Sequence, residues 1–180
     1  TFPIDMPGDG TNTYTFDGGD FTITIDSSYG ENWSGLFNPV ASAKLNIQNV
    51  NIVINKQFNG GAGALVNSGY QNNVTDSSVV IGDAIIDNCH VSTENSIGIS
   101  QNGGGLFGAR YGYNATITIR NCTNSLEISE EGAGGICGQY AGRKGTLTID
   151  NCDNTGVISG DNSGGICCLL YTSDAADEED

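Results

Sequence analysis

Five cysteines recur at regular spacing and are the side chains of this chain best suited to thiol chemistry. One set follows asparagine and the other closes a Gly-Ile-Cys phrase: Cys89, Cys122 and Cys152, then Cys137 and Cys167. Such spacing could support disulfides in a secreted protein. Residues stacked in register, however, rarely direct their Cβ atoms at one another as a disulfide requires. We therefore expect buried free thiols, with disulfides as the first alternative and a metal site as a remote one, because no CxxC spacing is present.

Carboxylates are the second group that could do chemistry, either by binding Ca²⁺ or by acid–base catalysis. Two acidic turns, Asp5 to Asp9 and Asp17-Gly18-Gly19-Asp20, offer the oxygen ligands that Ca²⁺ takes, although turn formation explains them as well. Ca²⁺ is thus a weak expectation, and no other cofactor is expected. The remaining acids expected to face outward are Asp83, Asp87, Asp150 and Asp153. They are scattered rather than convergent, so we assign no catalytic or metal-binding residue.

A sequence repeat of about 30 residues, present in two clear successive copies, positions these side chains. Asn121-Cys122 recurs as Asn151-Cys152, and Gly135-Ile136-Cys137 recurs as Gly165-Ile166-Cys167. Weaker copies stand upstream at Asp87-Asn88-Cys89 and Gln48-Asn49-Val50. A fixed period of this length is typical of a solenoid, in which each repeat buries its apolar face only against its neighbours.

Each repeat contains three short strand-like runs and no helical periodicity. In residues 134–167 the runs are Gly135-Ile136-Cys137, Thr146 to Asp150, and Val157-Ile158-Ser159. Thr-Leu-Thr-Ile alternates with the period of two that is typical of a strand. The sequence predicts an all-β fold, a parallel, right-handed, three-sided β-solenoid with about 30 residues per coil and roughly four to five coils.

Aligned copies predict which side chains share a column of the stack. Two columns are apolar and should face inward: Leu45, Ala84, Ile117 and Leu147, then Ile47, Ile86, Ile119 and Ile149. An unbroken asparagine column should form a structural hydrogen-bond ladder: Asn49, Asn88, Asn121 and Asn151. A further column should place Arg120 between Asp87 and Asp150 as an exposed ion-pair ladder.

Composition and charge narrow the classes of partner. The chain has 21 acidic and 6 basic residues and a net charge of −15, which argues against nucleic-acid binding. No apolar run is long enough to predict a membrane span. We expect residues 1–32 to form an irregular first coil or cap and 33–167 the repeats. Residues 168–180, CLLYTSDAADEED, resemble the translation of a sequencing-library adapter; a genuine acidic tail is the alternative.

The phrases GLFG at 105–108 and GICG at 135–138 resemble the GLUG-type repeat of secreted adhesin-like proteins. The longer phrase, IxNCxNxGxIxG followed by SGGIC, looks like repeats in large β-helical proteins of giant algal viruses and aquatic microbes. The resemblance covers roughly residues 33–167, and the fourth glycine is missing at Phe37-Asn38 and Val66-Asn67. It implies surface display and attachment, and it carries no catalytic residues.

The leading hypothesis is therefore a non-catalytic structural or adhesive segment of a larger extracellular or virion-surface protein, with neighbouring coils, end-to-end copies and surface glycans as partners. A carbohydrate-active β-helix enzyme and an ice-binding solenoid, based on Thr116/Thr118 and Thr146/Thr148, are the alternatives. The loop tyrosines that could stack on sugars are Tyr111, Tyr113 and Tyr140, with loop packing as the other reading. Sequons that could carry N-glycans stand at Asn32, Asn73 and Asn114.

Overall fold

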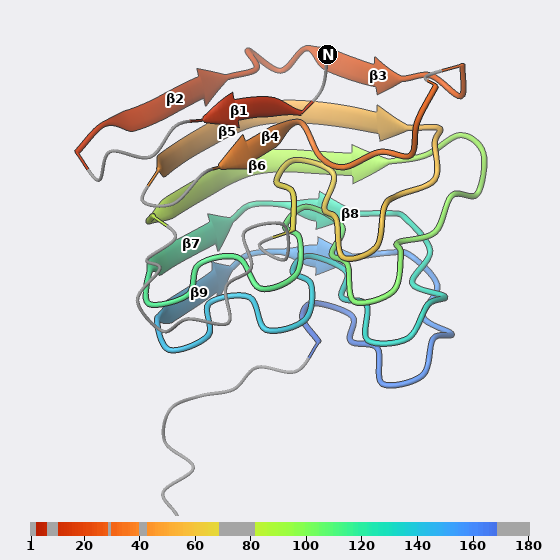
Figure 1. The fold of residues 1–180 in the computed structure, drawn as a ribbon. Helices are drawn as coiled ribbons and strands as arrows, with labels where there is room; N and C mark the ends of the chain where they lie inside the picture. The colour runs from red at the N-terminus through yellow and green to blue at the C-terminus, as the bar shows by residue number, and fades with distance from the viewer. Residues whose placement is uncertain (1–2, 7–10, 29, 40–42, 69–81, 169–180) are drawn as a thin grey trace, which may run out of the picture.

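Parallel strands stack as a β-solenoid of about four turns, and there is no helix among the described residues. The computed structural model describes residues 3–6, 11–28, 30–39, 43–68 and 82–168. Figure 1 shows the strands lying one above another, from the N-terminal segments at one end of the stack to β9 at the other. The predicted all-β parallel solenoid is confirmed. None of the described residues belongs to a helix long and apolar enough to cross a bilayer.

The strands form two sheets. A short sheet pairs β1 with β4, and a larger one runs along the stack (Figure 1). The strands are β1 (Ile4–Met6), β2 (Thr13–Asp17), β3 (Thr22–Ile25), β4 (Phe37–Pro39), β5 (Lys44–Ile54), β6 (Ala84–Ser92), β7 (Thr116–Arg120), β8 (Thr123–Asn124), β9 (Thr146–Asp150) and β10 (Asp153–Asn154). Every strand pair is parallel, so each coil returns the chain to the same starting edge.

The predicted columns are confirmed in register. Leu45 pairs with Ala84, Ala84 with Ile117, and Ile117 with Leu147. The Ile47 column follows the same pairing, and both columns face the core except in the last coil, where they are half-buried. Ile85, between the two columns, faces outward and is 43% exposed. The alternation of the sequence therefore fixes which face of each strand packs inward.

The described part of the N-terminal segment stacks on the solenoid as a first coil. Strand β2 pairs with the first half of β5, and β3 pairs with its second half. Tyr14 and Phe16 are half-buried against the core, whereas the outward alternate positions of β2 are exposed. Alternating apolar residues thus extend the register of the stack into residues 13–25, where the sequence led us to expect a less regular arrangement.

The coils are also joined by a further line of parallel strand pairing that the sequence did not predict. The three predicted runs are present, two of them as isolated bridges such as Cys137 to Cys167 and Ile128 to Ile158. The fourth line joins β8 to β10, immediately after the asparagine turn. These strands have only two residues each, too short for alternation to be visible in the sequence.

Candidate functional site

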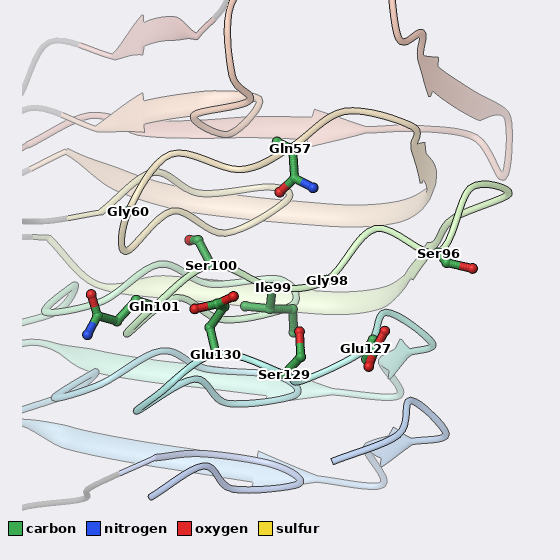
Figure 2. A pocket seen from close by; sticks show the side chains of 10 residues that line it. All are labelled: Gln57, Gly60, Ser96, Gly98, Ile99, Ser100, Gln101, Glu127, Ser129 and Glu130. Atoms are coloured by element: carbon green, nitrogen blue, oxygen red, sulfur yellow. The ribbon is translucent and has the colours of Figure 1, made fainter. Parts of the chain in front are cut away.

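A polar groove runs along the side of the stack and draws on several coils of the described part of the chain. Its main hollow has a volume of about 390 Å³ and draws on three successive coils, as Figure 2 shows. Gln57 comes from one coil, Ser100 and Gln101 from the next, and Glu127 and Glu130 from the third. The other lining residues are Gly60, Ser96, Gly98, Ile99 and Ser129. A volume of this order is enough for a small ligand.

A second hollow of about 330 Å³ adjoins the first, since Ser96 and Glu127 line both. Glu94 and Val157 also lie on its wall, and the rest of its lining is hydroxyl groups and backbone: Thr93, Ser125, Thr155 and Gly156. Together the two hollows, which we call the lateral groove, run across several coils. A ligand that follows the stack axis, such as an oligosaccharide, would fit this shape better than a compact one.

The floor of the lateral groove is held by coil-to-coil hydrogen bonds. The Ile99 amide donates to the Glu127 carbonyl at 2.8 Å, and the Ile128 amide donates to the Val157 carbonyl at 2.8 Å. The side chains of Ile99 and Ile128 are fully buried beneath this backbone. Because a fixed backbone loses little entropy on binding, the groove is preorganised.

The groove is polar and acidic. Glu94, Glu127 and Glu130 line its two hollows, and no basic side chain does. Two of its polar side chains are oriented by neighbouring coils: Ser100 Oγ donates to the Asn59 carbonyl at 2.6 Å, and Gln101 Nε2 donates to Glu131 Oε2 at 3.3 Å. Hydroxyl, amide and carboxylate groups in this arrangement suit an uncharged ligand rich in hydroxyl groups, and they disfavour an anion.

Sequence reasoning did not identify this groove, although a signal was present. The dipeptide Ile-Ser recurs at Ile99-Ser100, Ile128-Ser129 and Ile158-Ser159, with a glutamate or glycine nearby in each copy. A buried isoleucine followed by an outward serine in successive coils places a column of hydroxyl groups on one side. The column could have been read from the same alignment that gave the asparagine ladder.

The predicted asparagine ladder is present but interrupted. Asn151 Nδ2 donates to Asn121 Oδ1 at 2.8 Å, and Asn88 Nδ2 donates to Asn49 Oδ1 at 2.9 Å. Between these pairs, Asn121 Nδ2 instead donates to Asp87 Oδ1 at 2.8 Å. All four asparagines have φ between 48° and 55°, the left-handed region that asparagine tolerates better than most residues. The column is thus a structural turn, as predicted.

The charged column pairs in one direction only. Arg120 Nη2 and Nε lie 2.8 and 2.9 Å from the same oxygen, Asp87 Oδ2. Arg120 also lies in register with Asp150, yet within the described residues its guanidinium forms an ion pair only with Asp87. The predicted second half of the ladder is wrong, because the Nε and Nη2 edge of the guanidinium faces Asp87 and no ion pair with Asp150 forms.

This ion pair should make stability depend on pH. Hydrogen bonds from Arg120 and then Asn121 lower the pKa of Asp87 below its ordinary value. A lowered folded pKa stabilises the fold above the unfolded value of about 4, and this stabilisation is lost as pH falls through the folded pKa. Asp87→Asn should cost less than about 1 kcal/mol at pH 7, because the pair is exposed. Thermal unfolding between pH 7 and pH 2 should show that difference shrinking in acid.

The matched control for this prediction is Asp161→Asn, an exposed acid of the last coil. Its unfolding temperature should follow the wild type across the same pH range. A difference between Asp87→Asn and wild type that persists unchanged to pH 2 would show that the ion pair is not its source.

The cysteines are free thiols, as expected. Cys89, Cys122 and Cys137 are fully buried, whereas Cys152 and Cys167, in the last described coil, are half-buried. Burial raises the pKa of the Cys152 thiol to about 11. Cys168, expected to begin a tail outside the repeat, is itself buried, with Sγ 2.9 Å from the Asn162 carbonyl. Residues 169–180 lie outside the described part of the chain.

The predicted tyrosine strip is wrong at one of its three positions. Tyr111 is 1% exposed and packs edge-on against Phe107, with ring centroids 4.5 Å apart. It therefore belongs to the core and cannot stack on an external sugar. Tyr113 and Tyr140 are half-buried and border a small hollow with arginines.

At one of the two turns where Ca²⁺ was weakly expected, the Asp17 carboxylate accepts hydrogen bonds from the protein. Asp17 Oδ1 accepts from the Gly19 amide at 2.9 Å, and Asp17 Oδ2 accepts from Gln48 Nε2 at 2.7 Å. The other turn ends at Asp9, outside the described residues; Asp5 Oδ1 accepts from Asn38 Nδ2 at 2.8 Å. Among the described residues, no group of three or more Asp, Glu, His or Cys side chains could hold a metal ion.

Among the described residues, the sequons and the threonines lie at the positions expected from the sequence. Asn32 and Asn114 are exposed, and Asn73 lies outside the described residues. Thr116 pairs in register with Thr146, and Thr118 with Thr148. The next coil places Ile85 beside Thr118. The outward threonine array therefore ends after two coils on this side. Two coils make only a small flat surface for binding ice.

Comparisons with known proteins identify no relative of the chain. No protein-family model, no curated protein and no solved structure gives a significant match to the chain.

Proposed function

We propose that this chain is a non-catalytic structural and adhesive segment of a larger extracellular or virion-surface protein, and that it holds carbohydrate in the lateral groove. The observation that carries the proposal is the groove itself, a preorganised, polar hollow that extends over three coils of a stiff stack. Its hydroxyl, amide and carboxylate groups can exchange hydrogen bonds with sugar hydroxyls. The acidity of its walls favours neutral or amino sugars over anionic ones.

The last described coil supports a role as one segment of a longer stack. Ile158 is 49% exposed, whereas Ile128, one coil earlier in the same column, is fully buried. A further coil in the same register would bury the Ile158 side chain as each coil buries the one before it. Such stacking gives the stiffness and reach that suit an attachment fibre.

A glycan array that spans neutral, amino and acidic oligosaccharides tests the adhesive role. We expect neutral or amino sugars to bind, and Glu127→Ala to weaken binding about tenfold or more, because one hydrogen bond to a charged group contributes about 1.5–3 kcal/mol. Glu31→Ala removes an exposed acid that does not line the groove and should leave binding unchanged. An array without any bound sugar, or equal losses in both variants, would contradict the proposal.

One observation favours an enzyme as the second candidate: Glu127 and Glu130 line the same hollow. Paired carboxylates beside a bound sugar are what glycoside hydrolysis requires. An assay for new reducing ends, after the protein is incubated with the sugars that it binds, distinguishes adhesion from hydrolysis. We expect none above the buffer control; release that disappears in Glu130→Gln would replace the adhesive proposal with a catalytic one.

A further inference from the structure

A cluster of basic and aromatic side chains lies outside the lateral groove. Loops 108–115 and 138–145 are copies of each other, 30 residues apart, and both precede a strand of the main sheet. Together they carry Arg110, Arg143 and Lys144, which are three of the six basic residues in a chain of net charge −15. We call this cluster, with Tyr113 and Tyr140, the basic–aromatic patch. Positive charge in this protein is therefore concentrated at one place.

Cation–π contacts hold the cations of this patch over its rings. Arg110 Cζ lies 5.4 Å and Arg143 Cζ 5.7 Å from the centre of the Tyr140 ring. Lys144 Nζ lies 5.4 Å from the centre of the Tyr113 ring. All three distances are within the range in which a ring attracts a cation. Both guanidinium groups thus lie over a single ring.

A small hollow of about 30 Å³ lies among Arg110, Tyr113, Tyr140 and Arg143. That space holds on the order of one or two water molecules, or a single oxyanion group. It is too small for a sugar ring, which would remain outside. There the half-buried ring of Tyr113 offers a flat surface on which the apolar face of a sugar stacks.

The backbone of the two loops is strained at the residues that form the patch. Arg110 and Tyr140, at equivalent positions, have φ of 56° and 60°, and Lys144 has φ of 58°. Residues other than glycine and asparagine hold this conformation at a cost of about 1–3 kcal/mol. Glycine or asparagine would form the same turns with less strain than these long side chains.

Hydrogen bonds between the two loops fix the patch in place. The Arg110 amide donates to the Gln139 carbonyl at 2.8 Å, and the Gly142 amide donates to the Tyr111 carbonyl at 2.8 Å. The guanidinium groups and rings are therefore presented by a rigid base rather than by a loose loop.

From these contacts we propose that the basic–aromatic patch is a second binding site, which takes a sulfate or carboxylate group carried on a sugar. The oxyanion enters between Arg110 and Arg143, because the planar donors of a guanidinium match such groups. The sugar that carries it stacks on Tyr113. The patch thus selects anionic glycans, which the acidic lateral groove disfavours.

Titration calorimetry with dextran sulfate oligosaccharide, with unsulfated dextran of equal length and with inorganic sulfate tests this site. We expect the sulfated sugar to bind, dextran not to bind through the patch, and inorganic sulfate to compete only weakly. Arg110→Gln/Arg143→Gln should weaken binding of the sulfated sugar at least about tenfold. The control Lys44→Gln/Lys56→Gln removes the same charge elsewhere and should change it less than about twofold.

Three results would overturn the site: equal weakening by the two double variants, binding of dextran that Arg110→Gln/Arg143→Gln weakens as much as binding of dextran sulfate, or binding of a short DNA duplex as tight as that of dextran sulfate. Circular dichroism establishes that each variant is folded, and Arg143→Gln alone, at an exposed position, serves if the double variant does not fold. Tyr140→Phe should retain binding and Tyr140→Ala should lose it. A negative result at the basic–aromatic patch would not affect the prediction for Glu127→Ala in the lateral groove. The two proposals can therefore fail independently.

Discussion

Gly135→Ala should destabilise the protein by more than about 3 kcal/mol, enough to unfold a domain of ordinary stability. A Cβ at this position would lie 2.0 Å from the Gly165 carbonyl oxygen of the next coil and 2.8 Å from Asn154 Oδ1. Both neighbours are held in place, since the Gly135 amide donates to the Gly164 carbonyl at 3.1 Å and Asn154 Oδ1 accepts from Asn124 Nδ2 at 2.7 Å. The coil spacing itself would have to increase. Denaturant unfolding followed by far-UV circular dichroism measures the effect.

Gly60→Ala is the control for this prediction. A Cβ at Gly60 would have nothing within 4 Å, so the variant should match the wild type to within about 0.5 kcal/mol. Similar unfolding midpoints for the two variants would mean that the coils are not packed as closely as the structure shows.

Asn124→Ala should cost on the order of 2–4 kcal/mol, the second largest effect that we expect. Asn124 is fully buried; its Nδ2 donates to the Leu126 carbonyl at 3.1 Å and to Asn154 Oδ1 at 2.7 Å. Its Oδ1 accepts from the Leu126 amide at 3.1 Å. Alanine would leave the buried backbone groups of Leu126 without these partners and would open a void.

The comparison variant is Asn46→Ala, which removes an outward-facing asparagine from strand β5. Its cost should be within about 0.5 kcal/mol, as for most surface substitutions. Chemical unfolding at pH 7 gives both values. A loss at Asn124 no larger than the loss at Asn46 would show that the inner asparagine contributes little.

Asn124 also illustrates what the sequence could and could not predict. The outer ladder was visible because Asn49, Asn88, Asn121 and Asn151 recur in every copy. The inner pair, Asn124 and Asn154, recurs only in the last two copies, and Asn124 is fully buried, where a polar residue is not expected. The structure shows that Asn124 donates to Asn154 and also bonds the backbone of Leu126 inside the coil.

The fold was more predictable than the candidate sites for a physical reason. Strand register follows from alternation and a fixed period, and both can be read directly, as at Ile119 and Ile149. The direction of a side chain cannot be read in this way: Arg120 turns toward Asp87 rather than Asp150, and Tyr111 turns inward onto Phe107. The lateral groove depends on how far successive loops protrude, which the period does not encode.

The most direct test of the adhesive proposal is an NMR titration of isotope-labelled protein with the neutral or amino oligosaccharide that binds best on the array. We predict that amide shifts concentrate at the groove, at Gly98, Ser129 and Glu130, and that Glu127→Ala strongly reduces them at the same sugar concentration. Binding that leaves these amides unchanged, or that shifts only loops 108–115 and 138–145, would contradict the assignment of the lateral groove as the carbohydrate site.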